Sequence, residues 1–167
     1  MLSVYFIIII LFYLFDLFYR AARKMLYNRK IKSLLASICT KKELLYTDDK
    51  DILNMLALFY TKKGYKVKTT DMCGEALNGL ILDDLVFVEL WKNSIDHKLE
   101  IETAIKFSRC MQEASIHRGK LVTIGDFKMN TKLYCNKYVI ECINGDTLLD
   151  MLKELRYPAA AQVEITG

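Results

Sequence analysis

The chain contains few of the residues on which common catalytic and cofactor motifs depend. Its 167 residues include 7 glycines, 2 histidines and 1 proline. So few histidines and glycines leave little room for a Ser-His-Asp set or a glycine-rich phosphate loop, and no cofactor motif is present. Internal repeats and low-complexity segments are also absent, and with a single proline this predicts only one folded domain in the chain.

The cysteines do not form a recognisable framework. There are five of them, an odd number, no two form a C-x-x-C pair, and only two histidines could assist them. This pattern argues against both a disulfide framework and a zinc site. We therefore expect reduced, buried structural thiols at Cys39, Cys73, Cys110, Cys135 and Cys142.

The most informative segment is the apolar run at residues 1–19, MLSVYFIIIILFYLFDLFY, whose single charged residue is Asp16. About twenty apolar residues in a helix are needed to cross the hydrocarbon core of a bilayer. A cleaved signal peptide fits poorly, because the basic residues follow the run instead of preceding it. The run therefore predicts a transmembrane helix over 1–19; the alternative is a buried core helix of a soluble domain.

The charge distribution predicts the orientation of this helix. The chain has a net charge of +4, but its basic residues crowd the segment that follows the apolar run, and residues 46–167 are net negative. By the positive-inside rule the N-terminus lies outside, and the rest of the chain is cytoplasmic. Residues 20–46 alternate basic and apolar positions at helical spacing, which predicts a basic juxtamembrane helix able to attract anionic headgroups.

The remainder is expected to form one α/β domain over 47–155, followed by a flexible tail at 156–167. A turn at Asp83-Asp84 is expected between two strands, and the alternative is a hairpin turn at Asn78-Gly79. The element order is α-β-β-β-α-β-(α)-β-α, which implies a mixed central sheet. Its helices are predicted at 51–63, 96–115, 130–137 and 146–155, and its strands at 65–70, 77–82, 85–91, 121–124 and 138–143.

Four segments carry a family resemblance: GYKVKTT, ALNGLIL, LVFVELWK and LVTIGDFKMNTKLYCNKYVIECINGDTLLDML. Taken in order and spacing, they resemble the restriction-endonuclease fold of the Mrr type, which also occurs in related nucleases and tethered bacterial proteins. The resemblance covers about residues 48–155. It implies a restriction-endonuclease-like mixed-sheet domain, which follows the N-terminal transmembrane helix that the apolar run predicts.

The resemblance also implies a catalytic set, which this chain matches only in part. The family needs an Asp at the start of the second strand, and a Glu or Gln, one spacer and a Lys on the third, to hold Mg²⁺ and the attacking water. Here Asn78 stands at the place of the Asp and Glu89 at that of the Glu. Trp91 occupies the lysine position, and the lysine is Lys92. Strand alternation turns Lys92 to the opposite face from Glu89 unless a bulge intervenes.

These residues predict a catalytically inactive nuclease-fold domain that serves as a binding or assembly module at the cytoplasmic face of the membrane. Its expected partners are the bilayer and protein subunits of a membrane complex, with no cofactor. One alternative is an active tethered endonuclease or DNA-binding protein, with Mg²⁺ as cofactor; another is a small membrane subunit whose anchor pairs with other helices. DNA would be contacted by the basic cluster Lys62, Lys63, Lys66 and Lys68, unless that cluster is only a solvated face.

Overall fold

The computed structural model describes residues 2–70 and 79–156, except for the side chains of 2–11, Ala21, Lys24 and Asn28. Two compact units make up the chain, Met1–Leu34 and Leu35–Gly167. The first is a single helical segment and the second is an α/β unit. Each is described by itself below.

The first unit is formed by helix α1, Leu2–Ser37, whose last turn belongs to the second unit. Large apolar side chains between Phe12 and Tyr19 are exposed. Asp16 and Arg20 form an ion pair one turn apart, with 2.9 Å between Oδ2 and Nη2. Among the described residues, no helix combines the length and apolar character needed to cross a membrane. The predicted membrane helix over 1–19 depends mainly on the side chains of 1–11, which lie outside this description.

The predicted continuous helix over 20–46 is wrong, because the chain breaks after Ser37 and starts a new helix, α2, at Lys41–Tyr46. The break is caused by a capping box. Thr40 Oγ1 accepts the backbone N–H of Glu43 at 3.3 Å, and the Glu43 carboxylate accepts the backbone N–H of Thr40 at 2.8 Å. These reciprocal bonds satisfy backbone donors that a new helix would otherwise leave unpaired.

The α/β unit has the element order expected from the sequence. Its strands form one five-stranded mixed sheet in the order β1-β2-β3-β4-β5. The first three are antiparallel neighbours, and β4 and β5 are added parallel to β3. The bounds are α3 Asp49–Lys62, β1 Val67–Thr70, β2 Gly79–Leu82, β3 Val86–Trp91, α4 Ile101–Glu113, β4 Arg118–Thr123, α5 Met129–Lys137, β5 Ile140–Ile143 and α6 Gly145–Arg156.

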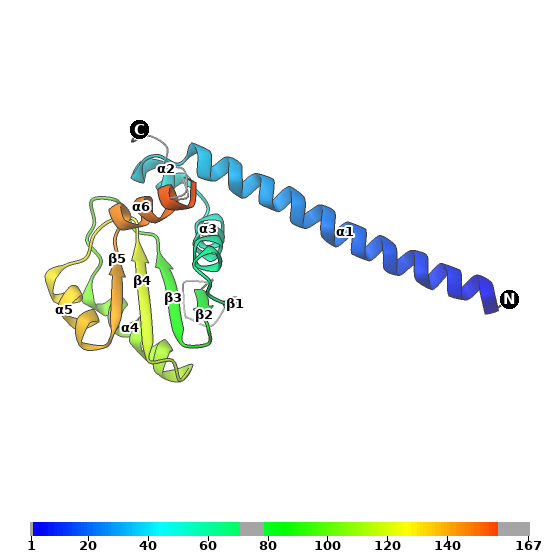
Figure 1. Ribbon diagram of the computed structural model, residues 1–167. Coiled ribbons are helices and arrows are strands. Elements are labelled where there is room, and N and C mark those ends of the chain that lie inside the picture. Colours follow the sequence, from blue (N-terminus) through cyan, green and yellow to red (C-terminus); the bar gives the residue numbers. More distant parts are fainter. Residues whose placement is uncertain (1, 71–78, 157–167) are drawn as a thin grey trace, which may run out of the picture. The chain divides into compact units, whose positions relative to one another are not determined.

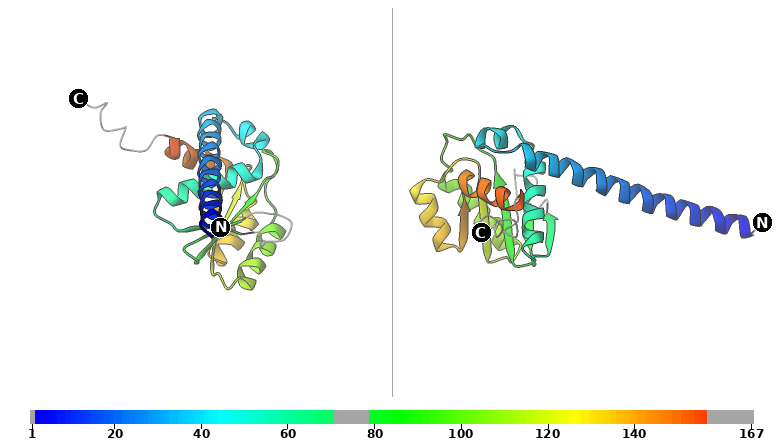
Figure 2. Two further views of the ribbon diagram at one scale, coloured as in Figure 1. Left: turned by 90° about the vertical axis from the view of Figure 1, so that its right-hand side faces the viewer. Right: turned by 45° about the horizontal axis from the view of Figure 1, so that its top comes forward.

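Helices cover both faces of this sheet (Figure 1). On one face, α4 and α5 enclose a core that includes Phe87, Phe107 and Phe127, with the rings of Phe87 and Phe107 5.5 Å apart. On the other face lie α3 and α6, which contact each other. Figure 2 gives two further views of these layers. The mixed α/β class predicted from the sequence is therefore confirmed.

The turn between β2 and β3 is at Asp83-Asp84, as predicted. Both residues have positive φ, 53° and 60°, which suits the twist of a tight hairpin. The alternative turn at Asn78-Gly79 is wrong, because Gly79 lies in β2 and pairs with Thr70 on one side and Glu89 on the other.

Three other expectations need correction. The helix predicted from residue 96 begins at Ile101, because Leu99 is drawn into a parallel bridge with Phe127. Arg156, which was predicted to lie in the tail, is the last residue of α6. Its guanidinium donates to the carbonyl of Ile38 at 2.6 Å.

Only Cys135 of the four described cysteines is fully buried, and Cys39 is exposed. Residues 157–167 and Cys73 lie outside the described part of the chain.

Candidate functional site

Strand β3 is the centre of the candidate site, because it is the middle strand of the sheet and carries the residues singled out above. Its side chains alternate between the two faces. Phe87 and Trp91 pack against the core beneath α4 and α5, so Glu89, which lies between them, faces the same way. The pairing of β3 with β4 runs without interruption from Val86 to Trp91. No bulge therefore interrupts this part of the strand.

Glu89 is a buried acid in an apolar setting. It is 2% exposed, and its Oε2 atom has no hydrogen-bond partner among the described residues. Burial raises the pKa of Glu89 to about 7, while the nearby Trp91 indole acts in the opposite direction. A carboxyl group in this state is partly protonated at neutral pH, because desolvation disfavours its charged form.

Two further buried polar atoms lie close to Glu89 in the sheet. Trp91 lies two residues after Glu89, so it points to the same face of β3. Thr123, on β4, is the cross-strand partner of Trp91. Thr123 Oγ1 has no hydrogen-bond partner within the described residues. The Trp91 indole interacts with Glu89 closely enough to lower its pKa, but its nitrogen has no hydrogen bond of standard geometry within the same residues. Buried polar atoms are normally paired, so this row of three is unusual. Thr123 lies in a segment that carries the family resemblance, but no functional role was predicted for it; the signal for such a role was a polar residue at an inward position of a buried strand.

Asn78 lies outside the described residues. Gly79, which follows it in the chain, pairs directly with Glu89, so β2 begins beside this acid. That is where the resemblance requires the second metal-binding residue.

Lys92 does not join Glu89. Its Nζ donates to the backbone carbonyl of Thr47 at 2.5 Å and lies 3.2 Å from Asp49 Oδ1. Both partners lie at the junction of α2 and α3, which belongs to the other face of the sheet. Lys92 directly follows the last residue of β3, and its side chain is held at the α2–α3 junction, away from Glu89, as the alternation of the strand predicts.

The described residues do not fit a Mg²⁺ site around Glu89. Such a site needs several hard oxygen ligands with negative charge, and Glu89 is a single acid whose charged form is disfavoured by burial. Across residues 2–70 and 79–156, no group of three or more His, Cys, Asp or Glu is placed to hold a metal ion.

The basic cluster at the end of α3 is largely engaged in contacts within the α/β unit. Lys63 pairs with Glu154, and Lys62 donates to the Leu155 carbonyl at 3.2 Å. Lys68 binds Asp84 Oδ1 at 2.5 Å; this bond, and then the charge of Lys66, lowers the pKa of Asp84. The four lysines are all exposed, but acidic side chains offset part of their charge. This geometry favours a solvated face.

Comparisons with known proteins give only distant similarity. No protein-family model matches the chain, and no curated protein is significantly similar in sequence. One similar solved structure is a protein of unknown function, AF1548, with 16% identity and a TM-score of 0.49, over 64% of this chain and 66% of that one. Another is the MspJI restriction endonuclease in complex with a 27-mer oligonucleotide, with 14% identity and a TM-score of 0.43. The match covers 84% of this chain and 32% of the endonuclease.

Proposed function

We propose that the chain is a membrane-anchored protein whose α/β unit has a restriction-endonuclease-like framework, has lost DNA cleavage, and serves as a binding or assembly module at the cytoplasmic face. The observation that supports the loss of cleavage is the separation of two side chains: Glu89 faces the core beneath α4 and α5, whereas Lys92, just after β3, is held by Thr47 and Asp49. In a metal-dependent nuclease the acid and the lysine act on one phosphate, so they must share a face.

The order of elements and the position of Glu89 support the proposed framework. The unit has the sequence α-β-β-β-α-β-(α)-β-α and a mixed sheet with β3 in the middle. Glu89 lies on this central strand, beside the start of β2. An acid at this place supports the resemblance, and the separation of Lys92 from it supports the loss of cleavage.

The sequence of the first unit supports the proposed anchor. Residues 1–19 hold one charged side chain and are followed by basic residues. In the described part of this run, Phe12 and Phe18 are 75% and 74% exposed. Large exposed apolar surfaces mark interaction sites, and an apolar helix with a basic flank suits a bilayer with that flank in the cytoplasm.

A cleavage assay on the full chain in detergent micelles tests the loss of activity. Plasmid DNA with Mg²⁺ or Mn²⁺ is expected to stay intact, because Lys92 is held by Thr47 and Asp49 and does not join Glu89. Asn78→Asp is the informative companion, since it restores only the missing charge and should still not cut. Metal-dependent nicking by the unaltered chain that disappears in Glu89→Gln would contradict the proposal and support the tethered endonuclease, for which Mg²⁺ would be the cofactor.

DNA binding without cleavage is the related alternative, and fluorescence anisotropy measures it. With Lys63 and Lys68 paired to acids, we expect weak association with double-stranded DNA at physiological salt. Tight binding that falls steeply with salt and is lost in Lys62→Ala/Lys66→Ala would overturn this expectation, because phosphate contacts release counterions.

Alkaline extraction of cell membranes tests the anchor. The full chain is expected to stay in the membrane pellet, whereas Leu14→Asp/Phe18→Asp should release it, since two charges in the apolar run disfavour insertion. Protease added to the cytoplasmic side should digest the α/β unit. Release of the unaltered chain, or protection of the unit from that side, would refute the proposed localisation. If the chain stays in the pellet, its protein partners are sought by capture with the intact membrane form.

A further inference from the structure

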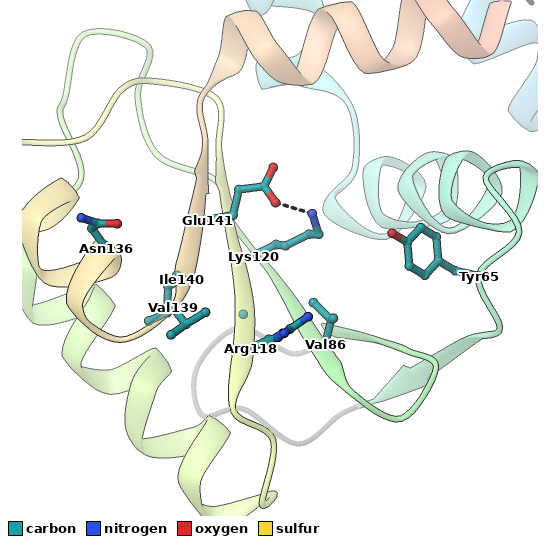
Figure 3. A pocket seen from close by; sticks show the side chains of 9 residues that line it. Tyr65, Val86, Arg118, Lys120, Asn136, Val139, Ile140 and Glu141 are labelled. Carbon is teal, nitrogen blue, oxygen red and sulfur yellow. Dashed lines mark hydrogen bonds and ion pairs between the residues drawn. The ribbon is translucent and has the colours of Figure 1, made fainter.

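A hollow of about 430 Å³ lies at the end of the sheet where the parallel strands begin (Figure 3). It is lined by residues of β3, β4 and β5 and by Tyr65, which follows α3. Lys120 reaches from this hollow towards α3, with its Nζ 5.7 Å from the centre of the Tyr60 ring. Lys120 therefore lies on the sheet face opposite to Glu89, whereas Ile140 belongs to the core beneath α4 and α5. The hollow lies at the end of the sheet, and Glu89 does not line it.

The hollow contains one arginine, Arg118, that has no partner among the described residues. Arg118 is exposed and lines the hollow, and no ion pair or hydrogen bond of its guanidinium occurs within the described residues. Lys120, by contrast, is engaged by Glu141 (Figure 3). A guanidinium has five N–H donors in a planar fork and no acceptor. It matches a phosphate or carboxylate in a bidentate manner.

The remaining walls provide an apolar surface and hydrogen-bond acceptors. Val86, Val139 and Ile140 line the hollow together with the Tyr65 ring, which is 39% exposed. The Tyr65 ring is fixed edge-to-face against Tyr60, 5.8 Å between centroids. Flat rings favour contact with such aromatic and aliphatic surfaces. The Glu141 carboxylate and the Asn136 amide oxygen line the same space. Both can accept hydrogen bonds from hydroxyl groups.

The backbone is strained at one wall of the hollow. Val139 has a φ of 57° directly after the end of α5, where glycine or asparagine is the usual residue. A β-branched residue in this conformation is an outlier. The Val139 carbonyl accepts a hydrogen bond from the backbone N–H of Gly119 at 3.2 Å. This bond holds the strained residue against β4, at the edge of the hollow. Strain of this kind concentrates at ligand sites.

We propose that this hollow binds a small phosphomonoester that carries a flat aromatic ring and hydroxyl groups, which is the chemistry of a nucleoside monophosphate. Arg118 binds the phosphate, the ring lies on Tyr65 and the aliphatic wall, and Glu141 accepts from a hydroxyl. The cavity volume suits a ligand of this size. The proposal is independent of the membrane anchor and of the state of Glu89.

Isothermal titration calorimetry on the full chain in detergent tests this site, with adenosine monophosphate as the probe. Saturable binding is expected, at least about tenfold tighter than for adenosine or inorganic phosphate alone. Arg118→Gln should weaken it by about tenfold or more, because a bidentate charged contact is lost. Arg109→Gln is the matched control, an exposed arginine on α4 that does not line the hollow and should leave binding unchanged.

A second variant separates the two halves of the ligand. Tyr65→Leu should weaken adenosine monophosphate while leaving inorganic phosphate unaffected. A 5′-phosphorylated single-stranded oligonucleotide distinguishes the source of the phosphate: Arg118-dependent binding tighter than that of the mononucleotide would assign the site to a nucleic-acid end, and equal or weaker binding to a free nucleotide. Absence of saturation at millimolar probe, or equal affinity for Arg118→Gln, would overturn the proposal. Thermal melting verifies that each variant is folded.

Discussion

Phenylalanine side chains have opposite surroundings in the two units. In α1, Phe12, Phe15 and Phe18 are 75, 67 and 74% exposed, whereas three others in the α/β unit are 1–2% exposed: Phe87, Phe107 and Phe127. The α/β unit buries its phenylalanines within its own core, whereas the described phenylalanines of α1 are exposed. The same residue type therefore stabilises the core of one unit, and in the other it forms the apolar surface on which the proposed anchor depends.

The largest test of this contrast is a matched pair of truncations, Phe107→Ala and Phe18→Ala. Phe107→Ala should lower the free energy of unfolding by about 3–5 kcal/mol, because it opens a cavity in a packed core. Phe18→Ala should change it by less than about 0.5 kcal/mol and instead weaken retention in membranes. Urea unfolding in micelles gives the first quantity. Similar losses for both variants would mean that α1 is part of a soluble core.

A second pair compares a buried carboxyl group with an exposed one. The folded pKa of Glu89 is raised from 4.5 to about 7, so between these values the native state binds more protons than the unfolded state. The free energy of unfolding therefore falls as pH rises through this window and is level above it. Glu89→Gln removes this loss. The free energy of unfolding of the variant, relative to that of the unaltered chain, should therefore rise by about 3 kcal/mol from pH 4 to pH 8.

Denaturant titrations at the two pH values measure this difference. Asp16→Asn is the matched control, because the Asp16 side chain is exposed and paired with Arg20; this change should have little effect at either pH. A Glu89→Gln difference that does not depend on pH would show that the Glu89 carboxyl is solvated. A stability of the unaltered chain that rises with pH in the presence of Mg²⁺ would show instead that a cation holds the carboxylate.

Helix length provides a third, smaller contrast. The short α2 begins with a capping box, whereas α1 continues for 36 residues. Short helices depend on their caps, so Thr40→Ala should cost about 1 kcal/mol. Thr40→Ser keeps the accepting oxygen and should cost much less. Equal losses for both would assign the effect to the missing methyl group and not to the cap.

The smallest effect is one in which the two units should agree. Lys63–Glu154 in the α/β unit and Asp16–Arg20 in α1 are both exposed ion pairs. Double-mutant cycles should give about 0.2–1 kcal/mol for the first and about 0.3–0.5 for the second, both reduced by salt. A coupling energy well above this range for Asp16–Arg20, persisting at high salt, would place that pair in a low-dielectric environment.

Local patterns explain which features of the fold were predictable. The order of elements follows from periodicity, and the turn at Asp83-Asp84 from residues that tolerate positive φ. The separation of Lys92 from Glu89 follows from strand alternation alone. The break before α2 was also written in the sequence, as Thr40-Lys-Lys-Glu43, a capping-box signature; the helical spacing on both sides of it concealed the boundary.

Contacts between distant residues explain what the sequence could not predict. The late start of α4 depends on the bridge between Leu99 and Phe127. The partners of Lys92 at the α2–α3 junction come from a segment far along the chain. Arg118 lies in a hollow formed by three strands, which no local spacing indicates. In each case the decisive neighbour is set by tertiary packing.

The two kinds of pairing made by β3 have a consequence for the order of folding. Its antiparallel partner β2 is joined to it by a tight turn, whereas its parallel partner β4 pairs only after α4 has crossed over. Short hairpins close quickly and long connections slowly. We expect β2 and β3 to nucleate the sheet, with α4 and β4 docking later. Glu89 would then lose its hydration at the docking step, so the speed of that step should depend on pH.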